Sequence, residues 1–232
     1  MDDSAPPPLS LWLRELPITV PIVLSPLRRP RAVAGARDGG GQPVMVIPGI
    51  LSSDSATALL RRTLDGSGYL AYASEMGFLT GIKPATLARA VDRLAGIAQA
   101  EQRKVALVGW SLGGLYARVL AQRHPELVEL VMTLGTPFSG DRRANNAWRL
   151  YEAINDHTVD APPVPDDPAM KPPVKTVALW SRKDGVIAPA AARGLPHERD
   201  AEVEVPFHHF ALASTRPAIE RVVSELGRAL AG

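Results

Sequence analysis

The sequence predicts an α/β protein with one mostly parallel sheet of about six strands, helices on both faces of the sheet, and a short cap insertion. Two observations carry this prediction. Short continuous apolar runs, typical of strands buried on both faces, alternate with longer segments whose apolar residues recur at helical spacing. Turn residues follow several of the runs directly. This alternation predicts parallel strands joined by right-handed crossovers.

Six runs are expected to form the strands, and four amphipathic segments the main helices. The serines and Asp54 before the first helix are expected to cap it. The strands are expected at about 44–47, 69–73, 104–108, 127–134, 174–180 and 201–205, and the helices at about 56–64, 84–98, 112–120 and 219–230.

Length and composition narrow the class of protein. A chain of 232 residues fits one domain with a sizeable core. The formal net charge of +2 gives no general argument for nucleic-acid binding. Because the chain has no cysteine, it has no disulfide, no thiolate metal site and no cysteine nucleophile. We expect neither a metal nor an organic cofactor, and no nucleic-acid partner.

The expected domain organisation is an N-terminal extension over residues 1–42 and one domain over residues 43–232, with a cap or lid inserted at about 138–173. The first residues carry two acids and three prolines where a signal peptide needs a basic region. The early apolar run is broken by prolines and too short to span a bilayer. A cytoplasmic protein is therefore expected.

The extension itself has two interpretations. Its leucines between residues 9 and 16 predict a short amphipathic helix, and arginines follow up to residue 31. An apolar segment followed by arginines is typical of a peripheral contact with a membrane surface. The alternative is that residues 9–31 pack on the domain and leave their arginines in solvent.

The most informative stretch lies between the third strand and the helix that follows it. The five residues Gly109-Trp110-Ser111-Leu112-Gly113 match the G-x-S-x-G nucleophile elbow, in the required strand–turn–helix context. Glycines at 109 and 113 leave room for a tight turn and a close approach of strand and helix. The alternative for Ser111 is an ordinary helix N-cap.

A serine nucleophile needs a histidine to accept its proton and a carboxylate to orient the histidine. Asp184 follows the fifth strand, and His209 follows the sixth. Because parallel strands end at one edge of the sheet, these side chains are expected to meet Ser111 there. His208 is the second choice for the base.

Two other carboxylates compete for the role of the acid. Glu75 follows the second strand, and Asp200 precedes the sixth. Asp184 is preferred because it lies at a strand end, in a loop with a glycine directly after it.

Acyl transfer at a serine also needs donors for the developing oxyanion. The backbone N–H of Leu112 is one candidate, because it follows the nucleophile at a helix N-terminus. The second donor is expected in the loop after the first strand, where Ile50 is the first choice and Leu51 the second.

Apolar side chains near these loops are candidates for binding the substrate. An apolar cap helix over the pocket favours an acyl chain, and the alternative is that the cap packs on the domain and covers nothing. The cap candidates are Trp148, Leu150, Tyr151 and Ile154, and the candidate substrate-binding residues are Leu51, Trp110, Phe138 and Trp148.

Five segments together resemble the α/β-hydrolase-fold lipases and esterases, especially bacterial lipase-like members. They are VMVIPGIL, ALVGWSLGG, MTLGTPFSG, LWSRKDGVI and VPFHHFALAS, which occur in the family's order across residues 43–230. The resemblance implies Ser111 as nucleophile, Asp184 as acid and His209 as base, with Ile50 in the oxyanion hole. Two positions depart from the family pattern: Pro48 and Phe138 stand where the family often has histidine.

The predicted function is hydrolysis of carboxylic esters, with a small or lipid-like substrate, through an acyl-serine intermediate. The same triad serves thioesterases and acyltransferases, so these remain alternatives. A third alternative is a catalytically silent binding module. Acyl-chain length, alcohol and oligomeric state do not follow from the sequence.

Overall fold

The computed structural model describes residues 3–30, 33, 35 and 37–231. Its centre is a six-stranded sheet in the order β2-β1-β3-β4-β5-β6, in which every neighbouring pair is parallel. This confirms the predicted sheet, and the observed strands begin and end within two residues of the predicted bounds. The strands are β1 (Pro43–Ile47), β2 (Leu70–Ala73), β3 (Val105–Trp110), β4 (Val128–Leu134), β5 (Lys175–Trp180) and β6 (Ala201–Glu204).

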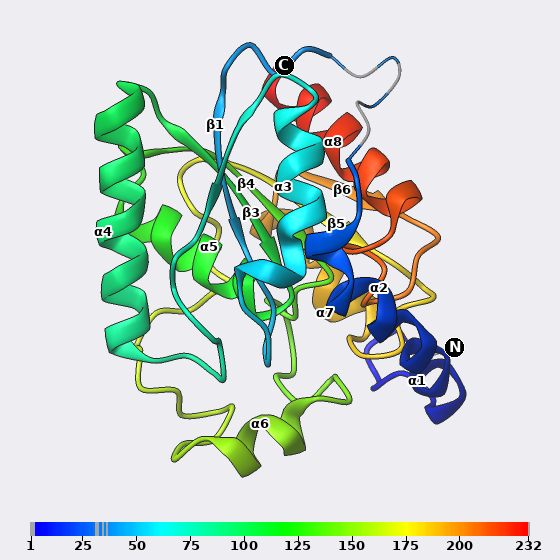
Figure 1. Cartoon of the computed structure of the whole chain (residues 1–232). Helices are drawn as coiled ribbons and strands as arrows, with labels where there is room; N and C mark the ends of the chain where they lie inside the picture. The colour runs from blue at the N-terminus through cyan, green and yellow to red at the C-terminus, as the bar shows by residue number, and fades with distance from the viewer. Residues whose placement is uncertain (1–2, 31–32, 34, 36, 232) are drawn as a thin grey trace.

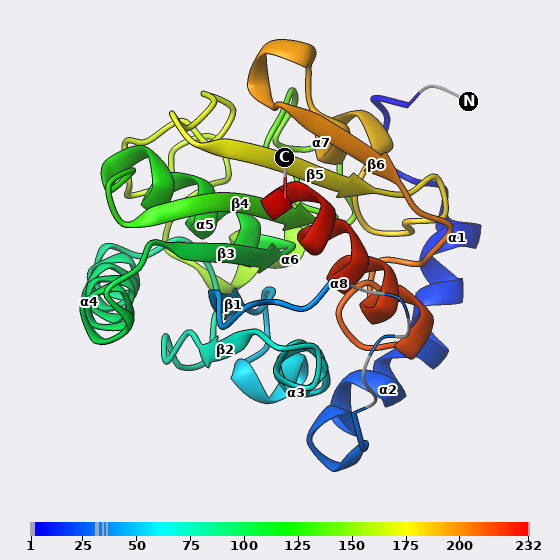
Figure 2. The same ribbon diagram turned by 90° about the horizontal axis from the view of Figure 1, so that it is seen from above.

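Helices cover both faces of this sheet, as predicted (Figures 1 and 2). Helices α3 (Ala58–Asp65) and α8 (Arg216–Ala231) pack on one face, and their leucines, isoleucine and valines join one core cluster. Helices α4 (Pro84–Glu101) and α5 (Leu112–Arg123) form the other core with the opposite side of the strands. The sheet is therefore buried on both sides, which explains its continuous apolar strands.

The expected cap of α3 is wrong. A 3₁₀ helix (Asp54–Thr57) precedes α3, and neither helix has a side-chain cap at its N-terminus. The Asp54 carboxylate instead accepts the backbone N–H groups of Ser74 and Glu75, at 2.9 Å each. It thereby fastens the loop after β2 to the loop after β1.

The N-terminal segment forms helix α1 (Leu9–Glu15), a 3₁₀ helix (Leu16–Ile18), helix α2 (Thr19–Val23) and a second 3₁₀ helix (Ser25–Leu27), which confirms the expected early helix. It lies against the domain beside α3 (Figure 1). The buried Ser25 Oγ accepts the N–H of Leu59 at 2.9 Å. Arg31, the last of the arginines in the proposed membrane segment, lies outside the described residues.

The cap region contains one helix, α6 (Trp148–Ile154), at the carboxyl end of the sheet (Figure 1). The irregular chain after α6 is fastened by Arg118 of α5, which is 1% exposed. The guanidinium of Arg118 donates to the carbonyls of Pro168 and Ala169, and to that of Glu198. Beyond β5 come α7 (Pro189–Arg193) and a 3₁₀ helix (Pro196–Glu198). No helix in the described part of the chain is long and apolar enough to cross a membrane.

The turn from β3 into α5 depends on glycines, as the motif predicted. A Cβ atom built on Gly109 would lie 2.4 Å from the carbonyl oxygen of Gly113. A Cβ on Gly113 would lie 2.3 Å from the carbonyl oxygen of Ile47 in β1. Both contacts are with backbone atoms, which cannot move aside cheaply, so the close approach of helix and sheet requires these glycines.

We expect Gly109→Ala to lower the free energy of unfolding by about 3 kcal/mol, because the added methyl group overlaps the backbone of α5. The measurement is urea unfolding followed by circular dichroism. The matched control is Gly96→Ala. Gly96 is an exposed residue of α4, and a Cβ atom added there has no neighbouring atom within 4 Å. The control should raise the free energy of unfolding by about 0.5–1 kcal/mol. Equal effects of the two variants would contradict the expectation.

Candidate active site

Ser111 stands at the tip of the turn between β3 and α5. Its backbone has φ 53° and ψ −119°, in a region that residues other than glycine rarely adopt. Its backbone N–H donates to the Leu134 carbonyl at 2.9 Å, and the Gly114 N–H donates to its carbonyl. A helix N-cap needs no such backbone, and the α5 N-terminus has no side-chain cap hydrogen bond. Strain of this kind is concentrated at functional sites.

The side chains of Asp184 and His209 meet at the carboxyl edge of the sheet. Asp184 Oδ2 lies 2.8 Å from His209 Nδ1, and both side chains are 2% exposed. Asp184 Oδ1 accepts the N–H groups of Val186 and Ile187, at 2.8 and 2.7 Å. Three donors therefore surround this buried carboxylate, which offsets the cost of removing it from water.

The backbone around the pair leaves room for it. Gly135, which follows β4 with φ +56°, would place a Cβ 3.0 Å from both Asp184 Oδ2 and His209 Nδ1. The Trp110 indole N–H donates to the His209 carbonyl at 3.2 Å, and the two rings are 5.8 Å apart between centroids. The residue before the candidate nucleophile therefore holds the backbone of the candidate base.

Electrostatics around His209 favour its protonated form. Burial alone lowers the pKa of the His209 imidazole, but the charge and hydrogen bond of Asp184 outweigh this, with a further contribution from Glu15. The net result is a pKa of His209 above its ordinary value. An imidazole whose Nδ1 faces a carboxylate presents Nε2 as the atom that exchanges a proton.

The structure brings Ser111 to the same sheet edge as this pair, without a hydrogen bond between Ser111 Oγ and His209 among the described contacts. Catalytic hydrogen bonds are often long before substrate binds and tighten in the complex. Gly49, in the loop after β1, lies close to the serine. A Cβ built there would be 3.3 Å from Ser111 Cβ.

The competing residues lie elsewhere. The carboxylate of Glu75 pairs with Arg93 at 2.7 Å and is largely exposed. Asp200 accepts the N–H of Thr176, at the start of β5 and hence at the opposite edge of the sheet. The imidazole Nδ1 of His208 lies 3.7 Å from Glu15 Oε1, and this structure pairs Asp184 with His209 rather than with His208.

The two loops that were expected to supply oxyanion donors border one cavity. Ile50, Ser111 and Leu112 all line it. Leu112 is the first residue of α5, where a helix has no internal acceptor for its N–H groups. The N–H of Leu51 donates to the Leu79 carbonyl at 2.6 Å, so it is engaged within the fold. This geometry favours Ile50 over Leu51.

The cavity beside Ser111 has a volume of about 120 Å³ and a mainly apolar wall. The cap supplies part of this wall through Trp148 and Tyr151, whereas Leu150 and Ile154 are exposed. The Tyr151 hydroxyl accepts the Ile82 N–H at 3.1 Å and so ties α6 to the loop before α4. The cap therefore forms part of the pocket wall.

Of the four predicted substrate-binding side chains, the structure brings only Trp148 to the wall of this cavity among the described residues. The other three side chains do not line it. The Phe138 ring is stacked 4.1 Å from the guanidinium of Arg118, and Trp110 packs on His209. Leu51 is 44% exposed and lies outside the wall.

One buried residue at the site was not predicted. Glu15, at the end of α1, is 1% exposed and contacts the loops that carry both Asp184 and His209. The sequence does carry a signal, because Glu15 is the only acid between Asp3 and Asp38 and lies in an apolar helix. A lone carboxylate among leucines is costly to bury unless it has donors. Among the described residues, no group of three or more His, Asp or Glu side chains is placed to hold a metal ion.

Comparisons with known proteins agree with this architecture. Residues 80–168 match the family model described as the alpha/beta hydrolase fold. A monoacylglycerol lipase from Paleococcus ferrophilus superposes with a TM-score of 0.57 at 16% identity, covering 82% of this chain and 96% of its own. The Bacillus licheniformis lipase BlEst2 has a TM-score of 0.57 at 18% identity, covering 82% of this chain and 95% of its own.

A thioesterase domain from the curacin biosynthetic pathway is also similar, with a TM-score of 0.52 at 14% identity, covering 81% of this chain and 92% of its own. At these identities the likeness concerns the fold alone. A comparison with curated protein sequences finds no match.

Proposed function

Because the chain has the α/β-hydrolase fold, we propose that it is a serine hydrolase that cleaves carboxylic esters through an acyl-serine intermediate. The fold supports hydrolase activity, and the triad and the ester substrate are the proposal. The observation that carries it is the buried pair of Asp184 and His209, 2.8 Å apart, at the sheet edge where Ser111 adopts a strained turn.

The proposed reaction has two steps. His209 Nε2 accepts the proton of Ser111 as Oγ attacks the ester carbonyl, while Asp184 holds the imidazole. The N–H groups of Leu112 and Ile50 bind the oxyanion. The C–O bond then breaks, and the alcohol leaves with the proton from His209. Water then gives a proton to His209 and attacks the acyl-serine; the bond between the acyl carbon and Ser111 Oγ breaks, His209 returns the proton to Oγ, and the carboxylic acid is released.

We expect a fluorophosphonate probe to label the wild-type protein at Ser111 and to leave Ser111→Ala unlabelled. His209→Gln should lower kcat by a factor on the order of 10⁴–10⁶, because the serine loses its base. His208→Gln is the matched control and should lose much less, since its ring is not paired with Asp184. Nitrophenyl acetate hydrolysis measures kcat.

A wild type that neither reacts with the probe nor cleaves esters would contradict the proposal and favour the silent binding module. If His208→Gln lowers kcat more than His209→Gln does, His208 is the base instead of His209.

The same site also suits thioester cleavage or acyl transfer, and the similarity to a thioesterase domain supports this second candidate. All three reactions share the acyl-serine, so they differ in the leaving group and in the acceptor. Faster turnover of an acyl thioester than of the matching oxygen ester would favour the second candidate.

The volume of the cavity limits the length of the acyl group that it can hold. Ligand pockets are often 300–1,000 Å³, and this one, at about 120 Å³, is smaller. Its wall includes Leu115, Val119 and Val164, which suit a hydrocarbon chain. We propose that this cavity takes a short acyl group.

We expect kcat/KM for nitrophenyl esters to peak at short acyl chains. Trp148→Ala should move the peak to longer chains, because it removes a large side chain from the cavity wall. Leu150→Ala is the control on the same helix, since Leu150 is exposed. A peak at long chains in the wild type, or equal shifts in both variants, would contradict this assignment.

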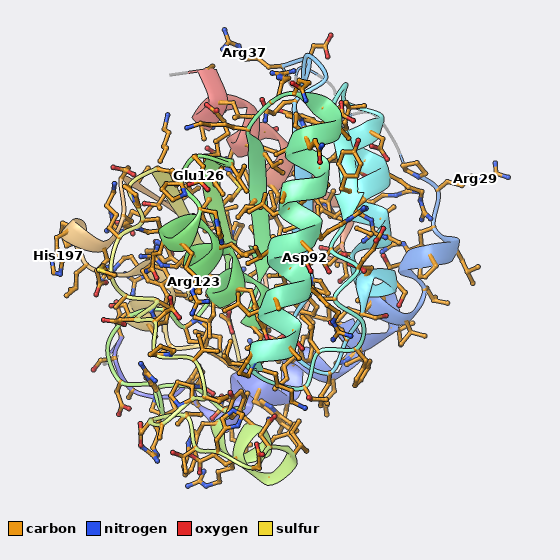
Figure 3. The ribbon with its side chains drawn as sticks, turned by 90° about the vertical axis from the view of Figure 1, so that its left-hand side faces the viewer. Arg29, Arg37, Asp92, Arg123, Glu126 and His197 are labelled. Atoms are coloured by element: carbon orange, nitrogen blue, oxygen red, sulfur yellow. The ribbon has the colours of Figure 1, made fainter. Side chains whose placement is uncertain are left out.

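We also propose that the N-terminal segment contacts an anionic membrane surface. Half of the exposed large apolar side chains among the described residues, seven of fourteen, lie between residues 9 and 27. Glu15 is buried, so the exposed charges of residues 4–30 are arginines, and Arg29 points into solvent (Figure 3). This N-terminal apolar face comprises Leu9, Leu13, Leu16, Val20, Val23, Leu24 and Leu27.

We expect the protein to sediment with vesicles that contain phosphatidylglycerol, and Leu13→Glu with Leu27→Glu to abolish this, because both changes place acids on the N-terminal apolar face. Met170→Glu is the control, because Met170 is an apolar residue of the cap region whose exposed fraction of 60% lies between those of Leu13 (51%) and Leu27 (80%). Binding should weaken with salt. If the wild type and the double variant pellet equally with vesicles, the proposed membrane contact is wrong.

A further inference from the structure

Glu15 is a buried carboxylate whose partners, among the described side-chain contacts, lie on the candidate catalytic loops. Its Oε1 accepts the backbone N–H of Gly185 at 2.8 Å and that of His209 at 2.8 Å. Its Oε2 accepts the N–H of Phe210 at 3.0 Å. Gly185 directly follows Asp184. One side chain from α1 therefore bonds to the loop of the acid and to the loop of the base.

These two loops are separate pieces of irregular chain, which are also joined by the hydrogen bond between Asp184 and His209. The acid loop (residues 181–187) follows β5, and the histidine loop (residues 205–210) follows β6. The buried Asp184–His209 bond requires the two loops to stay in register to a fraction of an ångström. An acceptor shared between Gly185 and His209 fixes this spacing directly.

Helix α1 is itself seated firmly on the acid loop. A Cβ built on Gly185 would lie 2.5 Å from the Leu11 carbonyl oxygen, so the helix backbone packs against this glycine. The Asn146 side-chain amide donates to the carbonyls of Pro7 and Gly185, at 2.9 Å each. The Asp3 carbonyl accepts the Ala190 N–H at 2.9 Å. These contacts hold α1 and the residues before it on the acid loop and on the start of α7.

We infer that Glu15 is a positioning residue for the Asp184–His209 pair, which it holds together by bonding the acid loop to the histidine loop. This inference rests on the proposed function, because the pair matters for activity only if His209 is the base. Glu15 does not touch Ser111 or the cavity wall among the described contacts. Its effect passes through His209.

The charge of Glu15 provides a second way to test this role, through the pKa of His209. The charged and titratable groups that face His209 are Asp184 from the acid loop, Glu15 from α1 and the neighbouring His208. A negative charge stabilises the imidazolium, so Glu15 helps to raise the pKa of His209. Removing the charge should lower that pKa and move the acid limb of kcat/KM to lower pH.

The test compares Glu15→Gln with the wild type. A glutamine of the same size accepts hydrogen bonds at only one of its two terminal atoms, so at least one buried N–H loses its acceptor. We expect kcat for nitrophenyl acetate to fall about ten- to hundredfold with a smaller change in KM. The pKa of His209, followed by NMR of histidine-labelled protein, should fall as well.

Glu15→Asp separates the two contributions. It keeps the charge but shortens the reach, so kcat should fall while the His209 pKa stays closer to that of the wild type. This variant also keeps the test usable if Glu15→Gln does not fold. Glu198→Gln is the matched control, because Glu198 is another buried carboxylate that accepts a backbone N–H, that of Leu195. It should change neither kcat nor the His209 pKa.

The inference is overturned if Glu15→Gln matches Glu198→Gln in both kcat and the His209 pKa. Failure of the proposed function looks different, since Ser111→Ala would then retain full activity or the wild type would show none. The NMR titration needs no turnover, and it still decides whether Glu15 acts on His209 in that case.

Discussion

The buried hydrogen bond between Asp184 and His209 is the contact on which the rest of the site depends. Two polar groups removed from water are stable only when the surroundings replace the lost solvation. Here the acid loop supplies two N–H groups to Asp184, and Trp110 donates to the backbone of His209. Gly135 leaves the space in which the pair meets. The loops, the turn at Ser111 and the end of β4 therefore all contribute to holding this buried pair.

The carboxyl edge of the sheet is held together by acidic side chains that bond to backbone N–H groups. Asp54 joins the loop after β1 to the loop after β2, and Glu15 joins those after β5 and β6. Loops that carry function have irregular backbone, and their buried N–H groups need acceptors from elsewhere. Side-chain carboxylates supply these acceptors, so the loops can keep an irregular backbone without unpaired buried N–H groups.

Much of this could be predicted from the sequence, for local reasons. Buried parallel strands are recognisable as apolar runs, and the elbow as five residues with required glycines, so the sheet and the position of Ser111 follow directly. Phe138 and Trp110 do not line the cavity, because Phe138 lies against Arg118 and Trp110 lies against His209. Glu15 was missed because its partners lie 170 and 194 residues away.

The seating of α1 changes how the chain divides into units. The sequence pattern breaks near residue 42, yet Glu15, Ser25 and Asn146 connect the preceding segment to the acid loop, the histidine loop and α3. Contacts of this kind couple the unfolding of one segment to that of its neighbours. Residues 3–30 are therefore expected to unfold together with the sheet, and shortening the chain there would remove contacts that hold the acid loop, the histidine loop and α3.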